Sequence, residues 1–180
     1  LGEPYYVALL SAAERHGAAH QRPQSLQVMV PKNRPPVECG QVRVLFVARG
    51  DLEQVPVSTF NTPHGYIKYS TPEMTALELV GYPQHAGGLN NVATVLAELG
   101  EEMDGDKLVE AAALCPIGWS QRLGYLLELV DAPGLAGAVE PLVAKKANSY
   151  IPLRRSEDVA GASRDSKWKV IVNVEVEPDE

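Results

Sequence analysis

The sequence predicts a fold of the α/β class, in its α+β form, with a mixed sheet of about five to six strands packed against a cluster of about five helices. Short segments of alternating apolar and polar residues fall between residues 25 and 70. Apolar residues then recur at helical spacing from residue 74 to residue 144, and strand-like segments return after residue 147. Strands gathered first and helices afterwards are typical of this class.

The N-terminal third contains one expected helix and three expected strands. Pro4, followed by an apolar stripe, predicts a short helix that Gly17 ends. Alternation predicts a strand at Ser25–Val30, with a proline-rich loop after it. A brief strand at Val37–Cys39 and a stronger one at Val42–Val47 follow, and the stronger one is expected to be central in the sheet.

A hairpin and the helix after it organise the middle of the chain. Residues 57–60 and 66–69 predict the two strands, and residues 61–65 supply the Asn, Pro and Gly that a turn needs. Thr71 is placed to cap the following helix with its hydroxyl. That helix carries an apolar stripe, including Leu77, that we expect to pack on the sheet.

Four further helices are expected. Asn90 is placed to cap the first of them, which runs to about Gly100. The next three are predicted at Asp104–Cys115, Ile117–Val130 and Leu135–Ala144. The remaining chain predicts a short edge strand at Tyr150–Leu153, a polar loop at Arg154–Ser166, and a strand in Lys167–Val176 whose core member is Ile171.

The bulk composition predicts one domain, residues 1–180, with a core in residues 1–146 and C-terminal strands and a tail in residues 147–180. With 180 residues that are 45% hydrophobic, the chain is long enough for one sizeable core. No run of about 18 apolar residues is present, so no membrane partner is expected. Cys39 and Cys115 fit neither a CxxC site nor a disulfide framework and are expected to be buried, reduced thiols.

Charge limits the kinds of partner. A net charge of -7 and a pI near 5.1 disfavour a broad basic face for nucleic acid. The chain has one candidate basic patch, and scattered solvated charges are the alternative interpretation. Its members would be Lys32, Arg34, Arg43, Arg49 and Lys68.

Four segments together carry a family resemblance. They are residues 5–17 (YYVALLSAAERHG), the hairpin running into Ser70–Glu73 and its Leu-rich helix, residues 87–99 (GGLNNVATVLAEL) and residues 121–128 (QRLGYLLE). In order and spacing they resemble the effector domain of AbiEi-type antitoxins, the antitoxin half of type IV toxin–antitoxin systems in bacteria, which act in abortive infection. None of these segments is a catalytic motif.

The resemblance implies a cytoplasmic antitoxin whose partner is an AbiEii-like nucleotidyltransferase toxin, neutralised with or without stable contact. Family members also regulate transcription of their own operon through an N-terminal winged helix, so DNA binding is expected only through that domain. The chain starts at Leu1-Gly2-Glu3-Pro4 without an initiator Met and is expected to be a fragment of a longer protein. A non-catalytic interaction scaffold and a degenerate nuclease-like domain are the alternatives.

The candidate partner-binding residues are Arg122, Gln121, Arg43 and Lys68. Gln121, Arg122 and Glu128 are expected on the polar side of one helix, where the resemblance is densest. Arg122 is suited to a bidentate contact, either with Glu78 inside the domain or with an acidic group on a partner. Glu78 is expected to be partly buried, with a structural role in pairing Arg43 or Arg122.

We expect no enzyme, cofactor or metal. No GxSxG nucleophile motif is present, and no ExK pair offers a nuclease metal site. His16 and His20 have the spacing of two metal ligands on a helix, but Gly17 interrupts it. Gly87-Gly88 before a helix is open to two interpretations, a simple connector or an anion cradle.

Overall fold

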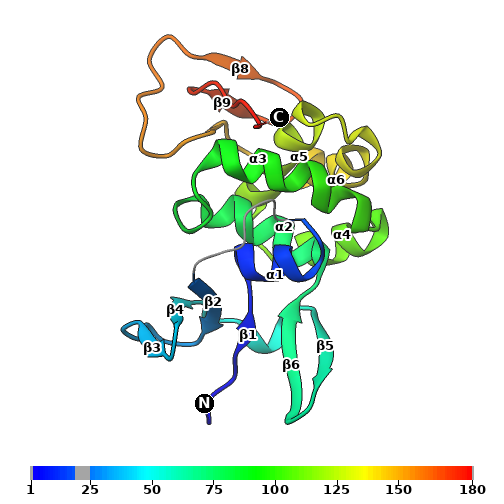
Figure 1. Ribbon diagram of the computed structural model, residues 1–180. Coiled ribbons are helices and arrows are strands. Elements are labelled where there is room, and N and C mark those ends of the chain that lie inside the picture. Colours follow the sequence, from blue (N-terminus) through cyan, green and yellow to red (C-terminus); the bar gives the residue numbers. More distant parts are fainter. Residues whose placement is uncertain (1, 19–24, 180) are drawn as a thin grey trace.

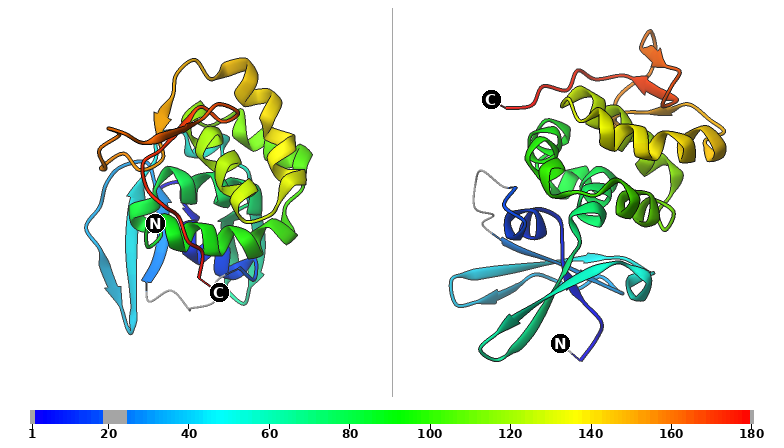
Figure 2. Two further views of the ribbon diagram at one scale, coloured as in Figure 1. Left: turned by 90° about the horizontal axis from the view of Figure 1, so that it is seen from above. Right: turned by 90° about the vertical axis from the view of Figure 1, so that its right-hand side faces the viewer.

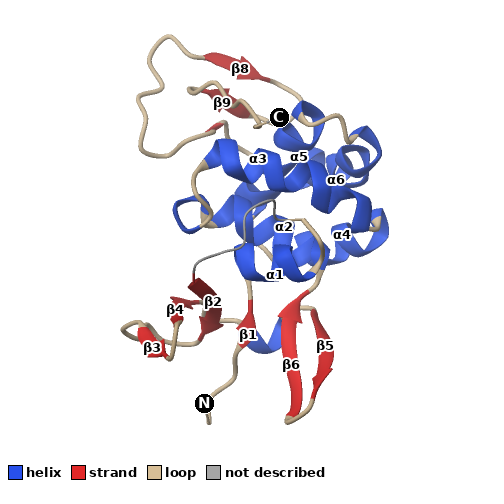
Figure 3. Ribbon diagram, in the orientation of Figure 1, coloured by secondary structure: helices blue, strands red, loops and turns tan. Residues whose placement is uncertain are grey.

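The computed structural model describes residues 2–18 and 25–179. The chain forms three stacked parts, which are a mixed sheet at one end, a cluster of helices in the middle and a small second sheet at the other end (Figures 1 and 3). The side view in Figure 2 shows the same order of layers. The predicted fold class, a mixed sheet against a helix cluster, is confirmed.

The large sheet has six strands in the order β3-β4-β2-β1-β6-β5. Its strands are β1 Tyr6–Val7, β2 Ser25–Val30, β3 Val37–Cys39, β4 Val42–Ala48, β5 Val57–Thr62 and β6 Gly65–Ser70. The central strand β1 pairs antiparallel with β2 and parallel with β6, and β2 pairs parallel with β4, so the sheet is mixed. The predictions of β2, β3, β4 and the hairpin are therefore confirmed, although β4 lies next to the edge strand β3.

The prediction of a helix starting at Pro4 is wrong. Tyr6 and Val7 form the central strand instead, and helix α1 begins only at Leu9 and ends at Arg15. Leu9 has a φ of 55, which turns the chain sharply from strand to helix. A two-residue strand has no visible alternation, and it exists here because two neighbouring strands offer it hydrogen bonds. Gly17, at φ 82, ends the helix as predicted.

The hairpin turn is tighter than residues 61–65 suggested. Thr62 pairs with Gly65, which leaves only Pro63 and His64 between the strands. Gly65 adopts a φ of 132, a conformation that side chains rarely permit. Two-residue connections of this kind fix the strand register, so β5 and β6 pair along their full length.

The helix cluster is built around α2, Pro72–Gly81. Thr71 caps it as predicted, since its side chain accepts a hydrogen bond from the N–H of Met74. The other helices are α3 Leu89–Leu99, α4 Gly105–Ala112, α5 Ile117–Leu129 and α6 Pro133–Lys146, and short 3-10 turns lie at Leu52–Gln54, Pro83–His85 and Gly100–Glu102. Asn90 does not cap α3. Gly88 occupies the cap position, and the Asn90 carboxamide oxygen accepts from the N–H of Glu177 at 3.1 Å.

The second sheet has the order β7-β9-β8. Its strands are β7 Ile151–Pro152, β8 Ser163–Asp165 and β9 Val170–Val172. The edge strand near Ile151 is confirmed, whereas β8 lies in the predicted polar loop and β9 is much shorter than Lys167–Val176. Ile171 is only partly buried, and Trp168 and Val170 are the core residues instead. A turn at residues 166–169 breaks the alternation that suggested a long strand.

We expect Leu77→Ala to lower the free energy of unfolding by about 2–5 kcal/mol, as large-to-small changes in packed cores do. Leu77 lies on α2 with 0% of its surface exposed. Thermal and urea melts of the variant measure the loss. A melt equal to that of the wild type would mean that this helix face does not depend on packing.

Candidate functional site

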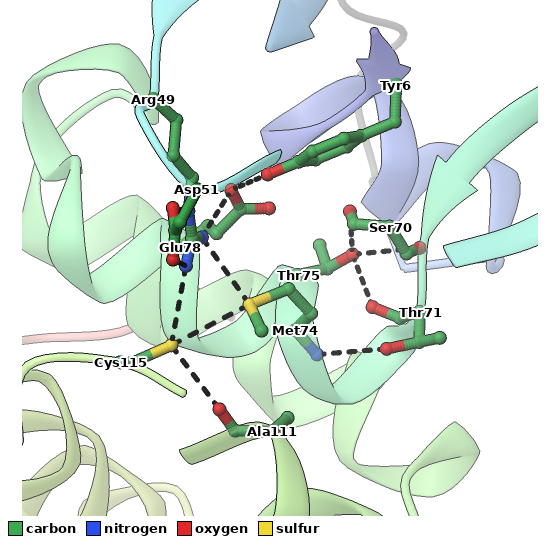
Figure 4. Close-up of polar contacts among 10 residues, drawn as sticks. All are labelled: Tyr6, Arg49, Asp51, Ser70, Thr71, Met74, Thr75, Glu78, Ala111 and Cys115. Carbon is green, nitrogen blue, oxygen red and sulfur yellow. Dashed lines mark hydrogen bonds and ion pairs between the residues drawn. The ribbon is translucent and has the colours of Figure 1, made fainter. Parts of the chain in front are cut away.

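A buried polar network joins the sheet to the helix cluster. The carboxylate of Glu78, on α2, is 0% exposed and accepts the Tyr6 hydroxyl at 2.6 Å and Nη1 of Arg49 at 3.0 Å. Both donors reach the same oxygen, Oε2, from the sheet side of the helix (Figure 4). Tyr6 comes from β1, and Arg49 directly follows β4. The network therefore ties three elements together at one oxygen atom.

Arg49 is the centre of this network. Its Nε and Nη2 donate to the two oxygens of Asp51 at 2.7 and 3.3 Å, which is a bidentate pair. Its Nη1 also lies 3.5 Å from the sulfur of Met74, and its guanidinium stands 5.3 Å from the ring of Trp119. Arg49 is thus satisfied on every side although it is only 6% exposed.

The predicted partners of Glu78 were wrong. Glu78 is buried, as predicted, but it pairs with Arg49 instead of Arg43 or Arg122. The N–H of Arg49 donates to the carbonyl of Val30, which places this residue at the inner end of the sheet beneath α2. Arg43 lies at the opposite end of β4, so its side chain starts too far from the helix.

Burial dominates the electrostatics of the network. Removal from water raises the pKa of Glu78 to about 7, although the Tyr6 hydrogen bond and the Arg49 charge act in the opposite direction. The second oxygen of Glu78, Oε1, has no hydrogen-bond partner among the described residues. Burial also raises the pKa of the Cys115 thiol, which disfavours a nucleophilic thiolate. Because Glu78 has no exposed surface, its carboxylate does not face solvent, and its contacts with Tyr6 and Arg49 join the sheet to the helix cluster.

The two cysteines differ from each other. Cys115 is half-buried, 3.7 Å from the sulfur of Met74, in agreement with the expectation for a core thiol. Cys39 is exposed on the edge strand β3, so the prediction of a second buried thiol is wrong. An edge strand has neighbours on one side only, and three residues are too short to bury a side chain. Both cysteines are free.

Gln121 and Arg122 lie on α5, but they do not face solvent as expected. Gln121 is 2% exposed, and its amide nitrogen donates to the carbonyls of Ser149, Trp168 and Lys169 at 3.1, 3.2 and 3.1 Å. Arg122 is 6% exposed, and its Nε donates to the carbonyl of Pro152 at 3.0 Å. The amide nitrogen of Gln121 and the Nε of Arg122 therefore bind the backbone of the C-terminal segment, which covers this side of α5.

Arg43 and Lys68 are exposed, on β4 and β6. Strands β2 and β1 lie between those two strands, so the residues do not gather into one basic patch. Arg43 is 3.7 Å from the carboxylate of Glu38 on the neighbouring strand, and both side chains are more than half exposed. Such a pair contributes little stability. Both residues remain free to contact a partner, and their role there stays a prediction.

A pocket of about 450 Å³ lies beside Arg122. It is bounded by the end of α2, the start of α3, α5 and the segment after β7. The lining includes Gly88 and Leu89 from α3 and the consecutive Arg154 and Arg155. Arg122 thus shares this pocket with two further arginines that sequence reasoning did not single out. Only the folding of the C-terminal segment against α5 brings the three together.

Residues 6–129 match the family described as the AbiEi antitoxin C-terminal domain. The match spans more than half of the chain. The chain belongs to this family. The AbiEi match ends at the last residue of α5, so the segment that Gln121 and Arg122 hold lies beyond it. The family is described as an antitoxin domain.

A solved structure shares the fold of this AbiEi domain. The crystal structure of the RV2827C protein from Mycobacterium tuberculosis matches with a TM-score of 0.63 at 15% sequence identity. The similarity covers 93% of this chain and 61% of that chain, so the AbiEi domain spans less than two thirds of the other protein. The C-terminal segment is therefore part of the shared fold. No curated protein matches the chain.

Metal sites and membrane-spanning helices have structural requirements against which the described residues can be compared. Among residues 2–18 and 25–179 of the AbiEi domain, no three His, Cys, Asp or Glu side chains lie together as metal ligands. A ring nitrogen of His16 is 2.8 Å from the carbonyl oxygen of Ser70, and His20 lies outside the described residues. In the same part of the chain, no helix has the length and hydrophobicity needed to cross a membrane.

Proposed function

We propose that this AbiEi domain is the antitoxin of a toxin–antitoxin pair and neutralises a nucleotidyltransferase-like toxin in the bacterial cytoplasm. The observation that carries the proposal is the family match over residues 6–129, which includes the hairpin, α2 and all of α5. The domain acts without catalysis, and it represses its own operon when it is joined to a winged-helix domain. The mode of action is that of a type IV system.

The proposed neutralising surface includes the two exposed basic residues, Arg43 and Lys68. Gln121 and Arg122 are buried against the C-terminal segment, at the other end of the molecule from the large sheet (Figure 1), so they are not proposed as contact residues of this surface. A basic side chain on an exposed strand is suited to an acidic group on a partner. The direct contact residues of the proposal are therefore Arg43 and Lys68.

The experiment is co-expression with the toxin encoded by the neighbouring gene. We expect the wild-type domain to restore growth, and Arg43→Glu/Lys68→Glu to restore it less well with an unchanged melting temperature, because charge reversal at an interface repels the partner. Lys145→Glu, an exposed change on α6, is the matched control and should protect fully. No rescue by a folded wild-type domain contradicts the antitoxin function. Full rescue by the double variant contradicts only the assignment of this surface.

A further inference from the structure

The pocket beside Arg122 has the chemistry of an anion site. It combines a buried arginine that lacks an acidic partner, two more arginines at consecutive positions, and the start of an eleven-residue helix. We propose that this pocket binds the phosphate group of a small phosphorylated organic molecule, of about the size of a mononucleotide. The inference is independent of the antitoxin function and would stand without it.

Arg122 provides the first argument. Its Nε is used by the carbonyl of Pro152, and no carboxylate of the described residues lies within ion-pair distance of its two terminal nitrogens. The residue is only 6% exposed. Burial, and then the positive charge of Arg155, lower the pKa of Arg122 to about 10. A buried guanidinium without a counter-ion is costly, and an anion in the pocket would relieve that cost.

The start of α3 provides the second argument. Gly88 is the cap residue, at φ 88, and no side chain caps the helix. The N–H of Gly88 is used by the carbonyl of Pro83, while the first turn of α3 contains no acidic residue. The first N–H groups of a helix have no partner within it and carry a partial positive charge. Because Gly88 and Leu89 line the pocket, the start of α3 lies at its edge, and helix starts commonly bind phosphate.

Two arginines at the mouth of the pocket, Arg154 and Arg155, differ in how far their charge is neutralised. Arg154 is 3.9 Å from the carboxylate of Glu157, which partly neutralises it. Arg155 is exposed beside Ser156, and both line the pocket. Two guanidinium groups, one buried and one exposed, are suited to the several oxygens of one phosphate group. Arg155 is therefore the accessible residue through which the site can be tested without disturbing the core.

Size and apolar lining point to a small organic phosphate. The pocket volume of about 450 Å³ exceeds what one phosphate group fills and lies within the range of small-molecule sites. Val80, Leu89 and Leu153 give it apolar walls on which an organic group can pack. A nucleic-acid backbone would instead need a broad positive face, which a chain of net charge -7 does not offer.

The test is isothermal titration of the 180-residue chain with adenosine monophosphate, ribose 5-phosphate and inorganic phosphate at low salt. We expect the wild type to bind at least one of these phosphates with a Kd of roughly 0.1–1 mM. Arg155→Gln should weaken binding about tenfold or more, since it removes a charge-assisted hydrogen bond. Lys145→Gln, which removes one positive charge from an exposed position of α6 outside the pocket lining, should bind as the wild type does.

Each outcome decides the proposal. Tighter binding of adenosine monophosphate or ribose 5-phosphate than of inorganic phosphate supports the proposal. Equal binding of all three probes contradicts an organic ligand, because the apolar walls would then contribute nothing. Absence of binding up to about 10 mM overturns the site, as does unchanged binding by Arg155→Gln. Tight binding of an oligonucleotide with none of the three small phosphates would also overturn it. Arg122→Gln is the second variant, and it should also weaken binding. Its melting curve shows whether a loss of binding comes from the missing charge or from unfolding.

Discussion

Replacing Arg49 with alanine is expected to lower the free energy of unfolding by about 3–5 kcal/mol near neutral pH and above, because it leaves a buried carboxylate without its cation. Arg49 donates to Glu78 at 3.0 Å and holds Asp51 through two further hydrogen bonds. Glu78 has no exposed surface, so its carboxylate depends on partners within the protein. Urea denaturation of Arg49→Ala at about pH 8 and about pH 5 measures the loss.

The pH dependence of this loss has a defined sign. The pKa of Glu78 is raised from 4.5 to about 7 in the folded protein, so the folded state binds this proton more tightly than the unfolded state. The stability from this group is complete below 4.5 and is lost as the pH rises to about 7. We expect Arg49→Ala to be least damaging at about pH 5, because Glu78 is already protonated there and needs no cation. Glu78→Gln should remove the fall in stability over this interval.

The pKa of Asp51 is shifted in the opposite direction from that of Glu78, so Asp51 makes stability depend on pH only under acidic conditions. The hydrogen bond from Arg49 lowers the pKa of Asp51 from its ordinary 3.8, so its contribution to stability is lost only at more acidic pH. The control for Arg49→Ala is Arg43→Ala, whose exposed pair with Glu38 should be worth at most about 1 kcal/mol. Equal losses for Arg49→Ala at the two pH values would assign its effect to packing against Trp119 instead of to charge.

Trp168→Ala should lower the free energy of unfolding by about 3–5 kcal/mol, because it empties the centre of the contact between the C-terminal segment and α5. Trp168 is 0% exposed, and its indole N–H donates to Glu128. Its ring lies against Gly124, where an added Cβ would come within 2.1 Å of the ring. In Gly124→Ala the new methyl group should therefore push the Trp168 ring out of its position. We expect this change to lower the free energy of unfolding by roughly 1–3 kcal/mol.

The two changes act on one contact, so their effects should not add. In Gly124→Ala/Trp168→Ala we expect a loss smaller than the sum of the two single losses, because the new methyl group fills space that the ring has left. Gly137→Ala is the matched control, since this exposed glycine of α6 has nothing within 4 Å of an added Cβ. It should stabilise the helix by about 0.4–1 kcal/mol. Melting curves of all four variants measure these effects, and a wild-type melt for Gly124→Ala would contradict the contact.

Local patterns were sufficient for most of the elements. The alternation in Ser25–Val30 predicts β2, and the cap at Thr71 predicts the start of α2, because in both cases the decisive groups are neighbours in sequence. The apolar stripe of Ile117–Val130 likewise predicts α5. Local patterns failed for Tyr6 and Val7, where two residues become the central strand through pairing with residues far along the chain.

The sequence by itself determined the fold class, the family and the start of α2, since these depend on periodicity, motif order and a local cap. Only the tertiary structure decided which charges meet. Glu78 was recognisable as an acidic residue in an apolar stripe, but its partner Arg49 is 29 residues away and lies beneath α2 because β4 ends there. Arg122 shares a pocket with Arg155 only because the C-terminal segment packs against α5. No periodic pattern in the sequence indicates which residue a charged side chain will pair with. The pairing follows from how the backbone elements pack.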